Sequence, residues 1–235
     1  MAFYYVAVFT AMVIIVPARA MHQIVYPLTA KLINTNDKHA LEDLYKRSAL
    51  NLYIIGGLLF LLIILNIHEL YRLIPASYSS GIGVVFLIAM AKLSDTLLGN
   101  NNAILFNSKY YKTVLLFGVL LAVLTVILNL IFIPVWGING AAFATLLAFL
   151  SYNSIKIGFV YARFGMHPFC RATLKTTGLL IGCWLLFYFW NFSFAPLVNM
   201  VLKSAILVIL YGVVILRFKL SEDISGLVSK YRRYF

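Results

Sequence analysis

Charged side chains are scarce in this chain. Only 11% of its 235 residues are Asp, Glu, Lys or Arg, whereas a soluble domain carries about 25%. The longest polar stretches, residues 31–47 and 217–235, are too short to build a hydrophobic core of their own. No segment is therefore left over for a soluble domain, and the hydrophobic content of 63% calls for a membrane environment.

Cysteine and other metal-binding residues are also few. Cys170 and Cys183 fall on opposite sides of a predicted membrane interface, so we expect neither a disulfide nor a metal site. The four histidines are scattered, without the spacing of a ligand set. The sequence has no nucleophile motif, Gly-rich phosphate loop or paired acidic cluster. It therefore predicts no cofactor and no enzymatic activity.

Apolar stretches of membrane-spanning length follow one another almost without interruption. Each approaches the about 20 residues that cross about 30 Å of hydrocarbon as a helix. The first has neither a basic leader nor a small-residue cleavage pattern, so we expect it to stay in the membrane. The sequence predicts an all-α polytopic transmembrane bundle at residues 1–216 and a basic amphipathic tail at 217–235. Its seven predicted spans are Ala2–Val25, Ser48–Asn66, Gly81–Gly99, Thr113–Pro134, Ile138–Tyr161, Leu174–Trp190 and Leu197–Leu216.

The net charge of +12 is concentrated in alternate loops. Most Lys and Arg residues lie in segments 31–47, 109–112, 163–175 and 217–233, and the loops between them are almost free of positive charge. Basic loops stay on the cytoplasmic side of a membrane. We therefore expect the C-terminus inside, the N-terminus outside, and no role for nucleic acid as the partner of this charge.

Two polar segments have the pattern of interfacial helices. In segment 36–47, apolar residues recur at helical spacing and Glu42 precedes Lys46 by four residues. The tail begins with Ser221-Glu222-Asp223, which resembles a helix cap with acids at the positive end of the helix dipole. We expect both helices to lie along the inner membrane surface. A solvated connector and a frayed tail are the alternatives.

The third predicted span carries charge deep in the membrane. Lys92 lies about 16 Å from the outer end of this span, where a charge must face a polar cavity or a partner. Asp95 lies three residues further on, on the same helical face. The two residues are either a neutralised structural pair or the cationic element of a substrate path, and snorkelling of Lys92 toward the headgroups is a third alternative.

Other membrane charges lie closer to the predicted ends of their spans. Snorkelling is the default expectation for Arg19, Lys156 and Lys203, because long stems can reach the headgroups. Arg19 carries more weight, because Pro17 and Pro27 free backbone carbonyls in the same span. Arg19 and His22 are accordingly candidates for the wall of a cavity, and with Lys92 and Asp95 they complete the predicted substrate path.

The joint between the fourth and fifth spans has the most specific pattern. Residues 129–145 place Pro134 and Gly137 at a sharp turn and then present Gly140, Ala141 and Ala142, small residues that allow close helix packing. This segment resembles the C-terminal region of bacterial polysaccharide flippases of the O-antigen translocase (Wzx) type. That family belongs to a superfamily that also contains the multidrug and toxin extruders. The short basic loop at 103–112 and the segment 27–30 are similar to the same family.

The resemblance implies a fold and a function. It implies the C-terminal lobe of a MATE-like flippase in the bacterial inner membrane, with membrane lipids around it and an N-terminal lobe missing from this chain. It also implies alternating-access translocation of undecaprenyl-pyrophosphate-linked oligosaccharide for O-antigen or other surface polysaccharide through a cationic cavity. The alternatives are a multidrug or organic-cation exporter of the same superfamily and a membrane acyltransferase or polymerase of the polysaccharide pathway.

Overall fold

The computed structural model describes residues 2–73, 75, 81–190 and 195–232. Within these ranges all regular secondary structure is helical, which confirms the all-α prediction. The elements in chain order are α1 (Ala2–Met12), the short 3₁₀-helix η1 (Val13–Ile15), α2 (Val16–Asn34), α3 (Lys38–Arg72), α4 (Ile82–Thr96), α5 (Asn101–Phe106), α6 (Tyr111–Phe164), α7 (Arg171–Tyr188), α8 (Pro196–Arg217) and α9 (Glu222–Arg232).

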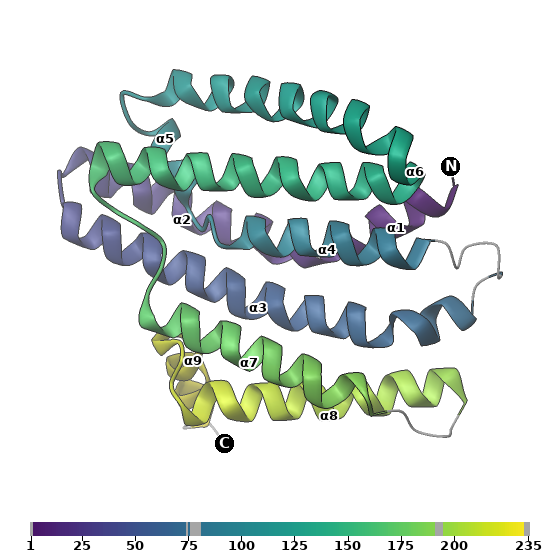
Figure 1. Cartoon of the computed structure of the whole chain (residues 1–235). Helices are drawn as coiled ribbons and strands as arrows, with labels where there is room; N and C mark the ends of the chain where they lie inside the picture. The colour runs from purple at the N-terminus through teal and green to yellow at the C-terminus, as the bar shows by residue number, and fades with distance from the viewer. Residues whose placement is uncertain (1, 74, 76–80, 191–194, 233–235) are drawn as a thin grey trace.

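Four continuous helical segments are long and apolar enough to cross a membrane. They are Tyr4–Asn34, Lys38–Arg72, Tyr111–Phe164 and Pro196–Arg217. The two shorter helices α4 and α7 run alongside them (Figure 1). A membrane-embedded helical bundle is therefore supported, and the count of seven crossings stays a prediction.

The first membrane helix is longer than the sequence predicts. Pro17 has no N–H to donate to the carbonyl of Val13, and the backbone N–H of Val16 donates to that carbonyl instead. This tightens the chain into η1 without ending the helix. Pro27 lies inside α2, which continues to Asn34 rather than ending at Val25.

The prediction of a separate surface helix at 36–47 is wrong. Residues 38–47 form the first turns of α3, which runs without a break to Arg72. The side-chain oxygen of Asp37 caps α3 by accepting from the N–H of Ala40 at 3.0 Å, and Lys46 and Glu42 form the expected pair at 2.6 Å. Leu41 and Tyr45 bury their apolar face against the protein interior instead of the membrane surface. This packing keeps the segment in line with the rest of α3.

The predicted sharp turn between two spans is confirmed inside α6. Gly137 has φ +56° and ψ −128°, a conformation that separates α6 into two antiparallel arms, 111–136 and 138–164 (Figure 1). A Cβ at Gly140 would lie 2.0 Å from the carbonyl oxygen of Phe132. The second arm then packs against α4 through the small residues Ala142 and Ala144, both fully buried.

The ends of the bundle differ in the turns that they carry. The turns after α2, around α5, after α6 and after α8 all lie at one end (Figure 1), called the basic end below. The N-terminus and Gly137 lie at the opposite end, called the N-terminal end. The segments with most of the positive charge are thus on one side of the bundle. Which side of a membrane this is remains a prediction.

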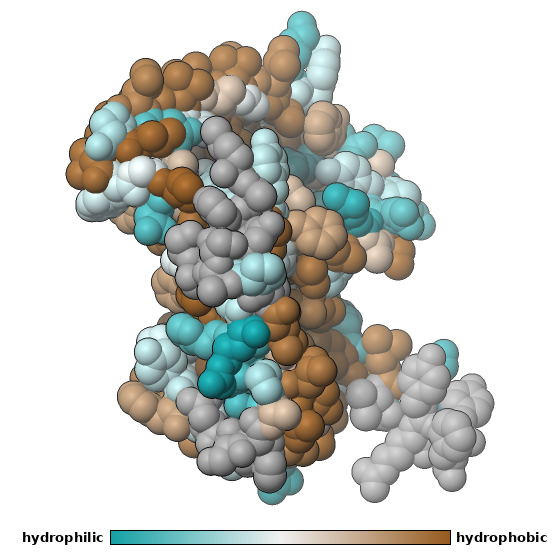
Figure 2. All heavy atoms as spheres, turned by 90° about the vertical axis from the view of Figure 1, so that its right-hand side faces the viewer, coloured by the Kyte–Doolittle hydropathy of each residue, from teal (hydrophilic) through white to brown (hydrophobic). Residues whose placement is uncertain are grey.

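The first arm of α6 presents an apolar outer surface. Leu115 is 75% exposed and Leu130 is 72% exposed. Figure 2 shows hydrophobic side chains over the upper flank of the molecule, where Figure 1 places this arm. Such a surface fits contact with lipid, because soluble proteins rarely expose large apolar patches.

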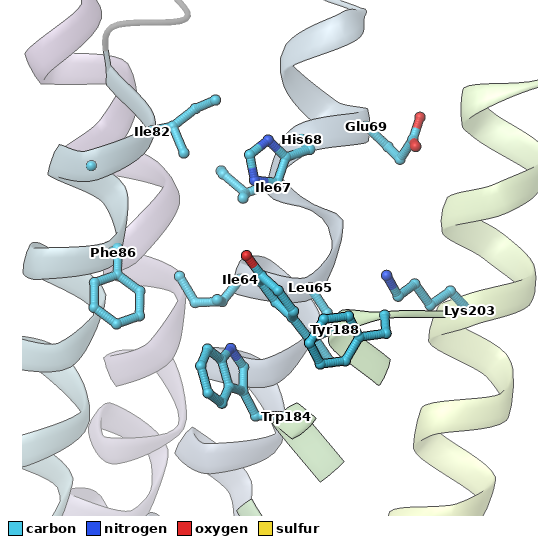
Figure 3. A pocket seen from close by; sticks show the side chains of 12 residues that line it. Ile64, Leu65, Ile67, His68, Glu69, Ile82, Phe86, Trp184, Tyr188 and Lys203 are labelled. Carbon is cyan, nitrogen blue, oxygen red and sulfur yellow. The ribbon is translucent and has the colours of Figure 1, made fainter. Parts of the chain in front are cut away.

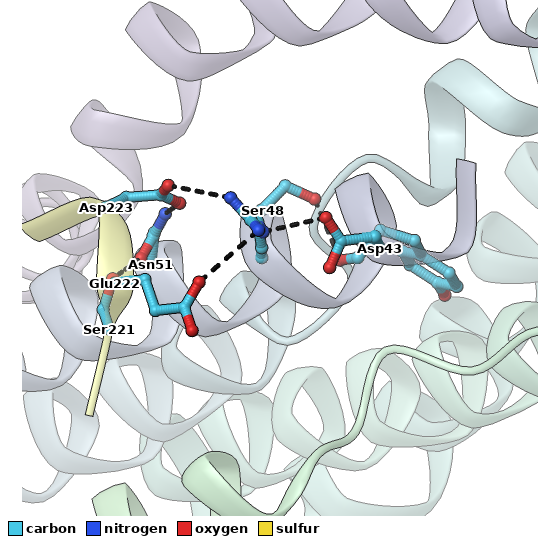
Figure 4. A network of polar contacts seen from close by, with 8 residues as sticks. Asp43, Ser48, Asn51, Ser221, Glu222 and Asp223 are labelled. Atoms are coloured by element: carbon cyan, nitrogen blue, oxygen red, sulfur yellow. Dashed lines mark hydrogen bonds and ion pairs between the residues drawn. The ribbon is translucent and has the colours of Figure 1, made fainter. Parts of the chain in front are cut away.

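The tail folds back onto α3. Ser221 caps α9, since its hydroxyl accepts from the N–H of Ile224 at 3.2 Å, which confirms the predicted helix start. Asn51 of α3 donates to Asp223 at 2.7 Å and accepts from the Ser221 hydroxyl at 2.6 Å. Arg47 forms longer ion pairs with Glu222 and Asp223 (Figure 4). The tail helix is therefore docked on protein at the basic end.

Candidate functional site

Polar side chains meet inside the bundle where α4 ends and α5 begins. Gly99 makes the connection possible: its φ is +52°, and a Cβ there would lie 2.7 Å from the backbone nitrogen of Ala49. Only glycine allows α4 and α3 to approach so closely in this backbone conformation. Three asparagines follow Gly99 and reach α2, α3 and α6.

The first two asparagines join the surrounding helices. Asn100 donates from its side chain to the Thr29 hydroxyl at 2.9 Å and from its backbone to the Ser48 hydroxyl at 3.2 Å. The Asn101 side chain donates to the Tyr45 hydroxyl at 2.8 Å. Both asparagines are fully buried. They tie the start of α5 to α2 and α3, at the level where the sequence places the inner start of the second span.

The third asparagine contacts a buried lysine. Lys156, on the second arm of α6, is fully buried, and its ammonium donates to the side-chain oxygen of Asn102. The same ammonium lies 4.9 Å from the centroid of the Tyr152 ring. Asp95 of α4 lines the same small cavity as Asn102. The structure therefore brings an acid and a lysine from different helices together.

Lys92 and Asp95 do not form a closed pair. In the described part of the chain, no ion pair joins the two side chains. The ammonium of Lys92 instead lies 4.3 Å from the centroid of the Phe149 ring on α6, a geometry that favours a cation. Lys92 is half-buried, so its charge is only partly compensated by the neighbouring acid.

A small cavity connects Asp95 to the first membrane helix. It has a volume of about 40 Å³, and Asp95, His22 and Asn102 contribute its polar lining. A space of this size accommodates water and not a substrate. Two of the four predicted path residues, His22 and Asp95, are thus neighbours in the fold.

Arg19 is exposed on α2. It lies ten residues before Thr29, about 15 Å along the helix from the level of Ser48 and Asn100. It is also the central residue of the apolar helical segment Tyr4–Asn34. The observed helix thus places Arg19 at its midpoint rather than near one end.

The snorkelling expectation is wrong for two other lysines. Lys156 is fully buried and Lys203 is only 4% exposed. A lysine that points into a bundle cannot be told from one that points outward until the helix packing is known. The sequence signal for the buried site is the run Asn100-Asn101-Asn102 in an otherwise apolar region. Glu69 was missed, because α3 continues past the predicted span end at Asn66.

This cluster has more basic than acidic groups. Lys92 and Lys156 accompany a single carboxylate, Asp95. Within the described ranges, no group of three His, Cys, Asp or Glu side chains could hold a metal ion. The arrangement can attract an anion, or hold helices together through charge, inside an apolar bundle.

No protein-family model, curated protein or solved structure matches this chain. The resemblance to polysaccharide flippases therefore stays a prediction from the sequence motifs.

Proposed function

We propose that the chain forms one lobe of a bacterial inner-membrane flippase that translocates undecaprenyl-pyrophosphate-linked oligosaccharide. The basic end faces the cytoplasm, and a second lobe completes the wall of the passage. The observation that carries the proposal is the exposed Arg19 at the midpoint of a helical segment long and apolar enough to cross a membrane. A charge in hydrocarbon costs at least about 2.5 kcal/mol, so this face of α2 borders a polar space.

The charge around that face suits an anionic cargo. Lys92 on α4 is half-buried and has no ion-pair partner among the described residues, and Arg19 adds a second cation. A pyrophosphate group needs positive charge in a low-dielectric space, whereas an organic cation needs acids. The excess of cations over Asp95 therefore favours a lipid-linked pyrophosphate over the drug-exporter alternative.

Deleting the gene in its own host tests the proposal, because any second lobe is then present. We expect loss of surface polysaccharide and accumulation of lipid-linked oligosaccharide on the cytoplasmic face. Wild type should restore both, Arg19→Gln and Lys92→Gln should restore neither, and Arg19→Lys should restore them in part. Lys175→Gln, at an exposed lysine of the basic end, is the matched control. Unchanged polysaccharide and lipid intermediates in the deletion strain would contradict the proposal.

A further inference from the structure

A larger pocket lies near the N-terminal end of the bundle. It has a volume of about 710 Å³ and is enclosed by the last turns of α3 and α7, the first turns of α4, and Lys203 of α8 (Figure 3). This volume falls in the range of about 300–1,000 Å³ typical of small-molecule sites. The pocket does not overlap the Asp95 cluster.

Aromatic rings form much of the wall. Phe86 comes from α4, and Trp184, Tyr188 and Phe189 come from the end of α7. Phe86 is 41% exposed and Tyr188 is 53% exposed, so their ring faces are accessible. Rings of this kind offer flat apolar surfaces to a ligand.

Polar atoms lie between the rings. The hydroxyl of Tyr188 points toward His68, and the indole nitrogen of Trp184 lies on the same side of the pocket (Figure 3). None of these three side chains has a hydrogen-bond partner among the described residues. Trp is a donor only, while Tyr and neutral His can both donate and accept. The pocket thus offers unused hydrogen-bonding groups next to flat apolar surfaces.

The acid of the pocket, Glu69, already has partners. Glu69 accepts from Asn199 at 3.1 Å and from Arg72 at 3.2 Å, and it also interacts electrostatically with the buried Lys203. No uncompensated acid remains there to select a cationic ligand. A purely apolar chain would leave the polar groups of His68, Trp184 and Tyr188 without partners, which disfavours a lipid tail as the occupant.

We infer that this pocket is a saccharide subsite. A sugar ring presents C–H groups on its faces and hydroxyls around its rim, which match aromatic walls with hydrogen-bonding groups between them. The choice of ligand rests on the proposed function, in which glycan emerges at this end of the bundle. The subsite holds part of the glycan by ring stacking and hydrogen bonds, at a place separate from the cationic residues.

Saturation-transfer NMR tests this on the full chain in lipid nanodiscs. The probes are maltotriose, chitotriose and trigalacturonate at millimolar concentration. We expect at least one of them to receive saturation from the protein. Tyr188→Phe removes only a hydroxyl from an exposed ring and should weaken binding at least threefold, while Trp184→Leu should abolish it. Tyr161→Phe, at an exposed tyrosine of the basic end, should bind like wild type.

Two outcomes would overturn the assignment: no probe binds the wild type, or binding survives both pocket variants at full strength. An unchanged melting temperature of Tyr188→Phe separates lost binding from lost folding. Binding requires no transport, so a chain that binds sugar but fails the deletion test supports the pocket and refutes the flippase. A chain that passes the deletion test but binds no sugar supports the flippase and refutes the saccharide subsite.

Discussion

Asp95 and Asn102 line one small cavity, and Asn102 accepts from Lys156 of another helix. The ammonium of Lys156 is fully buried and hydrogen-bonded to Asn102, whereas Lys92 lies over the Phe149 ring. Within this cluster, Lys156 therefore serves to join helices, and Lys92 is the cation whose charge is least compensated.

Double-mutant cycles measure this difference. Asp95→Asn combined with Lys156→Met should show a coupling free energy within the range of about 0.5–3 kcal/mol found for contacting residues. The same cycle with Lys92→Met should give a smaller value, because the Lys92 ammonium lies over the Phe149 ring and the Lys156 ammonium is hydrogen-bonded to Asn102 beside Asp95. Thermal unfolding in detergent supplies the four free energies of each cycle. Equal coupling in the two cycles would mean that Asp95 does not prefer Lys156.

The site residues were only partly predictable from the sequence. Spacing along one helix correctly placed Lys92 and Asp95 on neighbouring positions of α4. It could not reveal that Lys156, more than fifty residues away in the chain, approaches Asp95 from α6. Packing between helices decides which side a lysine faces, and span boundaries decide its depth. Arg19 was therefore placed near the end of its span because that span was ended at Val25, whereas the helix continues to Asn34.

At the level of elements, the turn inside α6 depends on two glycines. Gly137 adopts a positive φ, and Gly140 lies so close to Phe132 that a Cβ would meet its carbonyl oxygen at 2.0 Å. The contact is with backbone, which cannot move aside as a flexible side chain can. The two arms of α6 are thus held together at this point.

Gly140→Ala should separate the arms and destabilise the fold. We expect a loss of about 1–3 kcal/mol, the usual cost of overpacking. Gly118→Ala is the control on the first arm, where an added Cβ meets nothing within 4 Å. Alanine at position 118 should raise the free energy of unfolding by less than about 1 kcal/mol. Thermal unfolding compares the two variants, and Gly140→Ala should have the lower melting temperature. Equal melting temperatures would contradict the close contact at Gly140.

The tail helix α9 depends on Asn51 more than on its ion pairs. Asn51→Leu removes two short hydrogen bonds to Ser221 and Asp223 and should speed amide exchange at Ile224–Leu227 about fivefold, equivalent to about 1 kcal/mol. Arg47→Gln should have a smaller effect, because exposed ion pairs contribute about 0–1 kcal/mol. Hydrogen exchange with mass spectrometry compares the two. Faster exchange in Arg47→Gln than in Asn51→Leu would show that α9 depends more on the Arg47 ion pairs than on the Asn51 hydrogen bonds.

Element types were easier to predict than element boundaries. Runs of apolar residues identified the membrane helices, and Pro and Gly identified the turn at 134–140. The boundary at 47 was wrong because a polar amphipathic segment can continue a membrane helix when Leu41 and Tyr45 find buried neighbours. Sequence periodicity describes the faces of such a segment and does not say what covers them.

On the scale of the whole molecule, the two ends of the bundle have different charge. The basic end carries the turns rich in Lys and Arg, and the N-terminal end carries the turn between the two arms of α6 (Figure 1). In a membrane this asymmetry should orient the chain. Single cysteines at Val135 should be labelled from outside intact cells, and those at Lys109 or Arg171 only after permeabilisation. The opposite pattern would reverse the proposed orientation.

The most direct test of the proposed passage is the accessibility of position 19 in the membrane. In a background with Cys170→Ser and Cys183→Ala, Arg19→Cys should react with a hydrophilic thiol reagent. Undecaprenyl-pyrophosphate-linked saccharide should protect it. Val123→Cys is the matched control, at a similar depth on the lipid-facing arm of α6 and 48% exposed, and it should stay unreactive. A polar passage along α2 would be contradicted if Val123→Cys reacted and Arg19→Cys did not. It would also be contradicted if neither variant reacted.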